Sequence, residues 1–276
     1  MDNFPHWIDH IIAFAFCIAL PLYAARQRTK GTALIHFSSD QKKQIYISGS
    51  FSLFVMGAIV VSVWLIFSRP LAELGLTQPV NFRSWWWLAI IFVLVYLFDT
   101  VITLSSKKSI DETVDNWKKR TPFLPTKNNE LPEYFLLCFS AGVFEEIVYR
   151  GYLINYCWYL FEGYKYQQMI AVVLPALAFS VAHFYQGAKA VLKIFFLAVF
   201  FGYLFIYSGS LLIVMILHFL VDAAGGLLTI KYMKERFNHL VTKIIFCKQN
   251  FIYAEQLLQY VKVHHSHPLF SLAMQL

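Results

Sequence analysis

Residues 84–104 read SWWWLAIIFVLVYLFDTVITL and contain one charged side chain, Asp99. A run of about 20 apolar residues is long enough to cross a bilayer as one helix. Comparable apolar stretches lie at 7–24, 45–67, 132–157, 168–186, 189–207 and 210–229. Helices are expected because lipid offers no partner to an unpaired backbone group, and the alternating pattern of a membrane barrel is absent. The sequence therefore predicts an all-α, polytopic transmembrane helical bundle of about seven spans. It leaves open an eighth helix or a re-entrant segment within 108–131 or 250–261.

The composition also indicates that the solvent is lipid. Of the 276 residues, 58% are hydrophobic, 18% are aromatic and 14% are charged, which is more apolar surface than a soluble protein of this length can bury. The first span follows no positively charged segment and no cleavage site comes after it, so we expect it to remain in the mature protein. The cysteines form no C-x-x-C pair, and we expect buried thiols, not a disulfide framework or a zinc knuckle. They are Cys17, Cys138, Cys157 and Cys247.

Lysine and arginine residues alternate between loops, and this pattern predicts the orientation of the chain. The net charge is +7, but the charges form no single basic face, so we expect no nucleic-acid partner. Most of them fall in 25–44, in 105–131 and after 230, whereas 68–83 holds only Arg69 and Arg83. The positive-inside rule then places the N-terminus outside and the C-terminus in the cytoplasm. We expect an N-terminal transmembrane region at 1–67, a core at 68–230 and a cytoplasmic tail at 231–276.

Few ionisable side chains fall inside the predicted spans. Charged groups are costly in hydrocarbon, so those that persist usually face a bundle interior or a watery cavity and mark a candidate functional site. Asp99 lies near a cytoplasmic helix end and is more simply explained as a group that hydrogen-bonds one helix to another. The full set is Asp99, Glu133, Glu145, Glu146, Arg150, His183, His218 and Asp222.

Helix spacing divides this set into different roles. Residues four apart lie on one helix face, whereas adjacent residues diverge by roughly 100°. Glu146 and Arg150 are therefore expected to form a structural ion pair. Glu145 then has no basic partner on its own helix, and it must either take a proton or be held by polar groups of other helices. Asp222 lies one turn after His218.

Two chemistries fit these residues. In the first, Glu145 acts as a general base, His183 helps to hold a water molecule, and His218 with Asp222 orients the scissile carbonyl or stabilises the oxyanion. In the second, the same groups, above all Glu145, His183 and His218, bind a divalent metal such as zinc. The usual helical zinc signature His-Glu-x-x-His is absent, which favours the first chemistry without excluding the second.

Three motifs in three spans resemble those of the CAAX-protease/bacteriocin-processing (CPBP, or Abi) family of intramembrane proteases. They are Phe-Glu-Glu-Ile-Val-Tyr-Arg-Gly at 144–151, Phe-Ser-Val-Ala-His-Phe-Tyr-Gln-Gly at 179–187 and His-Phe-Leu-Val-Asp at 218–222. The order and the intervals agree, and the similarity covers most of 68–229, the expected protease core. The first span and the tail lie outside it.

The resemblance implies an intramembrane endopeptidase, glutamic-type without a cofactor or else metal-dependent. Its water would be positioned by Glu145 and His183, with His218 and Asp222 at the oxyanion; Glu146 and Arg150 match the remaining motif positions. The implied substrate is a membrane-associated or lipidated peptide or protein. Because the last motif position is Asp222 where the prenyl-protein branch has Asn, the sequence favours a bacterial-type branch. Such relatives act in bacteriocin maturation, self-immunity or peptide signalling, and they imply a bacterial cell membrane.

Two other classes of protein remain open from the sequence. Chains of intramembrane Asp, Glu and His also mark proton-coupled transporters, although this chain is short and shows no inverted repeat. A non-catalytic membrane scaffold or immunity protein could keep the fold without the chemistry. Other intramembrane proteases fit less well, because the sequence has no Gly-x-Ser-Gly and no Gly-x-Gly-Asp element.

Overall fold

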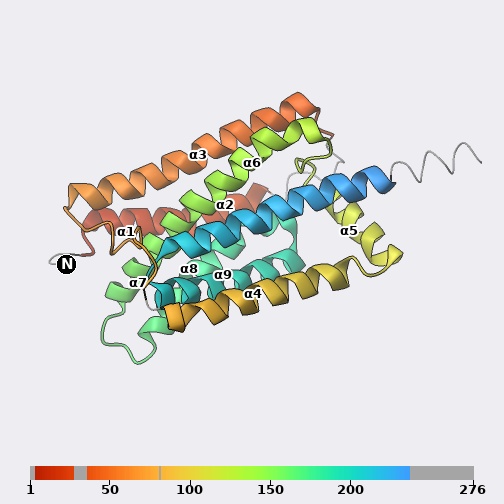
Figure 1. The fold of residues 1–276 in the computed structure, drawn as a ribbon. Coiled ribbons are helices and arrows are strands. Elements are labelled where there is room, and N and C mark those ends of the chain that lie inside the picture. Colours follow the sequence, from red (N-terminus) through yellow and green to blue (C-terminus); the bar gives the residue numbers. More distant parts are fainter. Residues whose placement is uncertain (1–3, 28–35, 81, 237–276) are drawn as a thin grey trace, which may run out of the picture. The chain divides into compact units, whose positions relative to one another are not determined.

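The computed structural model describes residues 4–27, 36–80 and 82–236, and this part of the chain is helical without strands (Figure 1). An N-terminal helix runs through α1 (Trp7–Phe14), a π-helical turn (Ala15–Ala19) and α2 (Leu20–Gln27). It is followed by α3 (Ser39–Ile66), α4 (Phe82–Thr103) and α5 (Lys107–Arg120). A long interrupted helix contains α6 (Leu131–Ser140), two π-helical segments (Ala141–Glu145 and Ile147–Leu153) and α7 (Ile154–Leu160). The hairpin of α8 (Gln167–Ala182) and α9 (Ala188–Ser208) and a last helix, Leu211–Arg236, complete the described part.

The expected helical membrane bundle is confirmed. Within the part of the chain that the structure describes, five helices are long and apolar enough to cross a membrane: Trp7–Arg26, Ser39–Ile66, Trp85–Thr103, Ala188–Ser208 and Leu211–Arg236. The spans predicted at 132–157 and 168–186 correspond to the interrupted helix and to α8, which is a shorter apolar helix. The tail predicted for 231–276 lies outside the described residues from 237 onward.

The interrupted helix packs closely against its neighbours because it carries small residues at two crossings. A side chain at Gly142 would press on the backbone of Met215 and Phe219 in the last helix. Further along, a side chain at Gly151 would meet the carbonyl oxygen of Leu74. Gly142 lies in the first π-helical segment and Gly151 lies in the second. Such segments occur frequently at functional sites. The helix that carries Glu145 therefore packs closely against the last helix and against the segment around Leu74.

The region 108–131, left open by the sequence, holds a polar helix and not another span. Helix α5 is rich in charged residues, and the side chain of Ser106 caps it by accepting a hydrogen bond from the Ser109 N–H. Its last turn carries Lys118, Lys119 and Arg120, whose positive charges interact favourably with the negative end of the helix dipole.

The start of the second span differs from the prediction. Helix α3 begins at Ser39, not near residue 45, because Ser38 and Gln41 form a capping box. Lys42, which the sequence assigns to a loop, therefore lies inside the helix and is only 4% exposed.

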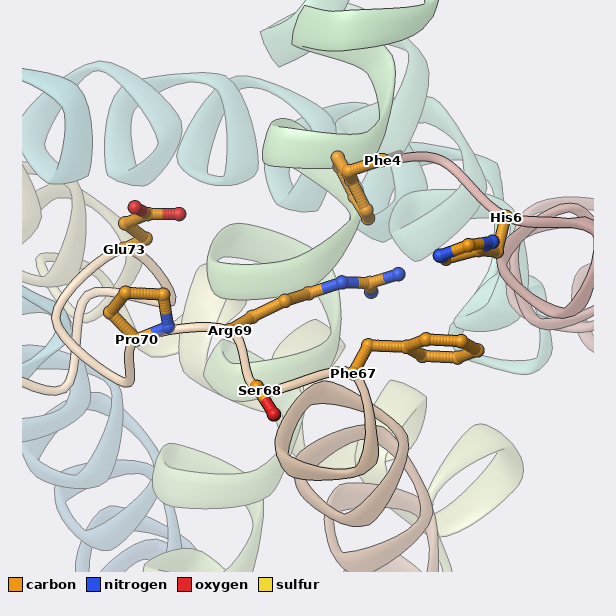
Figure 2. Close-up of a pocket in the computed structure, with 7 residues that line it drawn as sticks. All are labelled: Phe4, His6, Phe67, Ser68, Arg69, Pro70 and Glu73. Atoms are coloured by element: carbon orange, nitrogen blue, oxygen red, sulfur yellow. The ribbon is translucent and has the colours of Figure 1, made fainter. Parts of the chain in front are cut away.

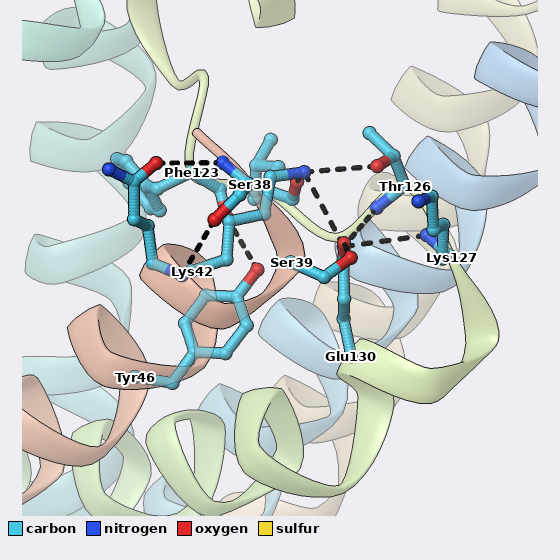
Figure 3. Close-up of polar contacts among 10 residues, drawn as sticks. Ser38, Ser39, Lys42, Tyr46, Phe123, Thr126, Lys127 and Glu130 are labelled. Atoms are coloured by element: carbon cyan, nitrogen blue, oxygen red, sulfur yellow. Dashed lines mark hydrogen bonds and ion pairs between the residues drawn. The ribbon is translucent and has the colours of Figure 1, made fainter. Parts of the chain in front are cut away.

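Buried Lys42 is satisfied by the segment that leads into α6. Its ammonium donates to Leu124 O at 2.8 Å and Thr126 Oγ1 at 3.0 Å, and it lies 3.4 Å from Glu130 Oε2 (Figure 3). Glu130 also accepts hydrogen bonds from Ser39 Oγ at 2.6 Å and from the Thr126 N–H at 2.7 Å. This network fastens the start of the interrupted helix to α3.

Asp9 and Arg69 form a second buried ion pair. Asp9 lies in the first predicted span but was not among the ionisable residues expected inside the membrane. Asp9 is fully buried and accepts two hydrogen bonds from Arg69, at 2.9 and 2.6 Å, and one from Tyr152 Oη at 2.8 Å. Figure 2 shows the Arg69 guanidinium between Phe4 and Phe67, whose ring centroids lie 4.4 and 4.8 Å from Cζ. A small pocket lies beside this structural contact, which joins the N-terminal segment, the turn after α3 and the interrupted helix.

Candidate active site

The four candidate catalytic residues line one cavity of about 920 Å³. Glu145 comes from the first π-helical segment, and His183 is the residue that ends α8. His218 and Asp222 come from the last helix. Three helices separated in sequence therefore bring carboxylate and imidazole groups to a common space, as the motif spacing predicts.

The expected pair of Glu146 and Arg150 is confirmed, and it lies behind the cavity wall. Glu146 Oε1 accepts from Arg150 Nη1 at 2.9 Å, and both side chains are buried. The guanidinium also lies over the ring of Phe179, with 4.6 Å from Cζ to the ring centroid. Phe179, which the sequence presents as packing, thus contacts the cation that neutralises Glu146.

Glu146 has a second contact that the sequence did not reveal. Its Oε1 atom lies 2.6 Å from His218 Nδ1. A carboxylate held by arginine can only accept, so Nδ1 carries the hydrogen and donates it. This bond orients the imidazole and directs Nε2 toward the cavity. Glu146 therefore has two contacts with different effects: it pairs with Arg150, and it fixes the tautomer of His218.

The Nε2 atom of His218 lies between two carboxylates. It is 3.7 Å from Glu145 Oε2 and 3.5 Å from Asp222 Oδ2. The Glu145 side chain is 15% exposed and that of Asp222 is 38% exposed, so Asp222 is the more accessible of the two. Both separations are longer than an ordinary direct hydrogen bond.

His183 is oriented by its own helix. Its Nδ1 atom lies 2.8 Å from the carbonyl oxygen of Phe179, one turn earlier, and a carbonyl can only accept. Nδ1 is therefore the donor and Nε2 is left as a free acceptor or base. The ring of Phe179 also packs against both imidazoles, with centroids 4.6 Å from His183 and 6.2 Å from His218.

The remaining intramembrane residues of the sequence analysis have partners elsewhere. Asp99 in α4 pairs with Lys193 in α9 at 2.8 Å, and both side chains are more than half exposed beside the cavity. This agrees with a helix-to-helix role for Asp99. Glu133 pairs with Lys43 of α3 at 3.1 Å.

The donor types for a metal are present, but their spacing is not that of a formed site. Glu145, His183 and His218, the expected ligands, offer the oxygen and nitrogen atoms that zinc accepts. Within the described ranges, no group of three or more His, Cys, Asp and Glu side chains has the arrangement of a metal site. Side-chain movement would be needed to gather them around one ion.

The fold and this cavity define a class: a polytopic helical membrane protein with acidic and imidazole groups gathered inside its bundle. Residues 127–224 match the family model described as type II CAAX prenyl endopeptidase Rce1-like. The matched segment contains all four candidate catalytic residues, and it confirms the resemblance inferred from the three motifs. Neither the curated proteins nor the solved structures compared with the chain gave a significant match.

Proposed function

We propose that this protein is an intramembrane endopeptidase that hydrolyses a peptide bond in a membrane-associated or lipidated substrate. The observation that carries the proposal is the convergence of Glu145, His183, His218 and Asp222 on one cavity, inside the segment that matches a protease family.

The proposed reaction begins with a water molecule held between Glu145 and Nε2 of His183. Glu145 takes a proton from this water as the oxygen attacks the scissile carbonyl carbon. The tetrahedral intermediate collapses when the bond to nitrogen breaks, and the proton on Glu145 passes to the leaving amine. The Nδ1–H bonds of the two imidazoles, to Phe179 O and to Glu146, keep both rings in place throughout.

In the proposed reaction, Asp222 orients His218. An ionised carboxylate would repel a developing oxyanion, whereas a neutral amide would stabilise it. The 3.5 Å separation between Asp222 Oδ2 and His218 Nε2 supports a role in holding His218, including its charged form. A protonated Asp222 could instead donate to the substrate.

A metal-dependent version of the proposal uses the same residues. Glu145, His183 and His218 would be the ligands, and a bound zinc ion would supply polarisation of the carbonyl and of the attacking water. Metal content of the purified protein, together with inhibition by a chelator, separates this version from the glutamate version.

The cellular setting is also a proposal. The loop charges support an N-terminus outside and a cytoplasmic C-terminus, with the cavity open toward the cytoplasm. The Asp at position 222 supports a bacterial-type enzyme of the cell membrane, acting in peptide or bacteriocin maturation or in self-immunity.

The decisive experiment compares purified wild type with Glu145→Ala and His183→Ala on a lipidated hydrophobic peptide. We expect each substitution to lower kcat by at least about 10³-fold, because each removes a group that activates the water. Glu133→Ala is a control on the same helix that leaves the cavity intact. Equal cleavage by all four proteins would contradict the mechanism.

A further inference from the structure

Tyr185 belongs to the second motif and lies beside the candidate active site, but it has no part in the proposed water activation. It is in the short 3₁₀ turn Phe184–Gln186 that joins α8 to α9, two residues after His183. It lines the same cavity as the four candidate residues, and it is partly buried. Its ring centroid lies 6.0 Å from that of His183 and 6.1 Å from that of Phe123. The turn and these two rings fix the position of the phenol.

The Tyr185 hydroxyl accepts one hydrogen bond and donates none to the described residues. Its oxygen accepts a bond from Gln186 Nε2 at 3.2 Å. Its own hydrogen has no acceptor among the residues that the structure describes. The phenol lines the same cavity as Glu145 and Asp222. A free O–H donor is therefore available in the cavity that holds the acidic groups.

Four other donors of this region already have acceptors. The Nδ1–H groups of His183 and His218 bond to Phe179 O and to Glu146. The hydroxyl of Tyr134, which also lines the cavity, donates to Asp222 O at 3.0 Å. The hydroxyl of Tyr96 lies 3.4 Å from Val221 O, a helix carbonyl.

The proposed reaction needs such a donor. A carbonyl oxygen becomes negatively charged in the tetrahedral intermediate, and enzymes of this kind stabilise it with preorganised N–H or O–H groups. Ionised Glu145 and Asp222 can only accept hydrogen bonds, and the free Nε2 of His183 is an acceptor as well. His218 could contribute only when it is doubly protonated.

We propose that Tyr185 donates its phenolic hydrogen bond to the carbonyl oxygen of the scissile peptide bond as that oxygen becomes an anion. The proposal rests on the endopeptidase function proposed above. Tyr185 keeps its proton, and no covalent bond to it forms or breaks. Because the charge develops only in the transition state, the interaction raises kcat and leaves substrate binding nearly unchanged.

The test measures kcat and KM of Tyr185→Phe on a lipidated peptide that the wild type cleaves. We expect kcat to fall by about 10²-fold with little change in KM, as for the removal of one oxyanion donor. A peptide aldehyde, whose hydrate mimics the tetrahedral intermediate, should lose affinity for Tyr185→Phe by a similar factor. Tyr96→Phe is the matched control: it removes another hydroxyl of the cavity wall and should retain the wild-type kcat.

The outcomes separate this proposal from the proposed function. An unchanged kcat in Tyr185→Phe, or a loss confined to KM, overturns the role of Tyr185; if Glu145→Ala is inactive in the same assay, the endopeptidase mechanism still stands. If Glu145→Ala cleaves as well as the wild type, the mechanism itself is rejected, and the oxyanion role of Tyr185 with it.

Discussion

At the scale of single residues, adjacent glutamates in one motif have different surroundings. Glu145 faces the cavity, where its Oε2 atom lies 3.7 Å from His218 Nε2. Glu146 is fully buried and holds both Arg150 and His218. Helix spacing predicts the Glu146 and Arg150 pair, because both residues lie on one helix. The contact to His218 crosses between helices 72 residues apart, so spacing within one helix gives no sign of it.

Glu146→Gln tests whether Glu146 positions His218. The substitution leaves Arg150 buried without its counter-charge, and we expect a loss of about 3–5 kcal/mol in stability. We also expect kcat to fall by about 10²-fold or more, because His218 loses the carboxylate that fixes its tautomer. Thermal unfolding and steady-state kinetics measure the two effects.

A double variant separates these effects. Glu146→Gln with Arg150→Met removes both buried charges, so most of the stability should return. Cleavage should stay low, since His218 still lacks its carboxylate. Full recovery of kcat in the double variant would show that the role of Glu146 is only structural.

At the scale of elements, the start of the helix that carries Glu145 depends on a buried ion pair with α3. Burial alone would raise the pKa of Glu130. The hydrogen bonds from Ser39 and the Thr126 N–H, together with the Lys42 ammonium, outweigh burial and bring this pKa below its ordinary value. The unfolded chain therefore binds a proton at Glu130 more readily than the folded protein does. This contribution to stability is present above the ordinary carboxyl pKa of about 4.3 and is lost as the pH falls through the lower folded value.

Glu130→Gln should destabilise the protein by about 3 kcal/mol at pH 7, because Lys42 would stay buried without a counter-charge. Lys42→Met combined with Glu130→Gln should recover much of this loss. The double variant should also lose less stability than the wild type does as the pH falls from about 5 to about 3. Thermal unfolding in detergent at both pH values measures this; an identical acid dependence of the two proteins would contradict the role given to Glu130.

At the scale of the whole molecule, three parts far apart in sequence meet at Arg69. Its guanidinium makes two hydrogen bonds to Asp9 while lying between aromatic rings, and Asp9 also accepts from Tyr152. Arg69→Lys keeps the charge but loses the flat forked geometry. We expect a loss of about 2 kcal/mol in stability, with kcat of the folded protein close to the wild-type value.

The matched control for this prediction is Arg120→Lys, because Arg120 is exposed at the end of α5. It should unfold at nearly the wild-type temperature. A similar unfolding temperature for Arg69→Lys would mean that the fork and the ring contacts contribute little.

The sequence alone determined that the protein is a helical membrane bundle and that Glu145, His183, His218 and Asp222 are its candidate catalytic residues. Apolar length and spacing of four residues are local properties, and they can be read along the chain. The tertiary structure decided which charges are buried as pairs, including Asp9 with Arg69 and Lys42 with Glu130. It also decided the tautomer of His218 and the position of Tyr185 in the cavity. These features depend on contacts between separate helices, whose relative rotation and depth are set by packing and not by any pattern within one helix.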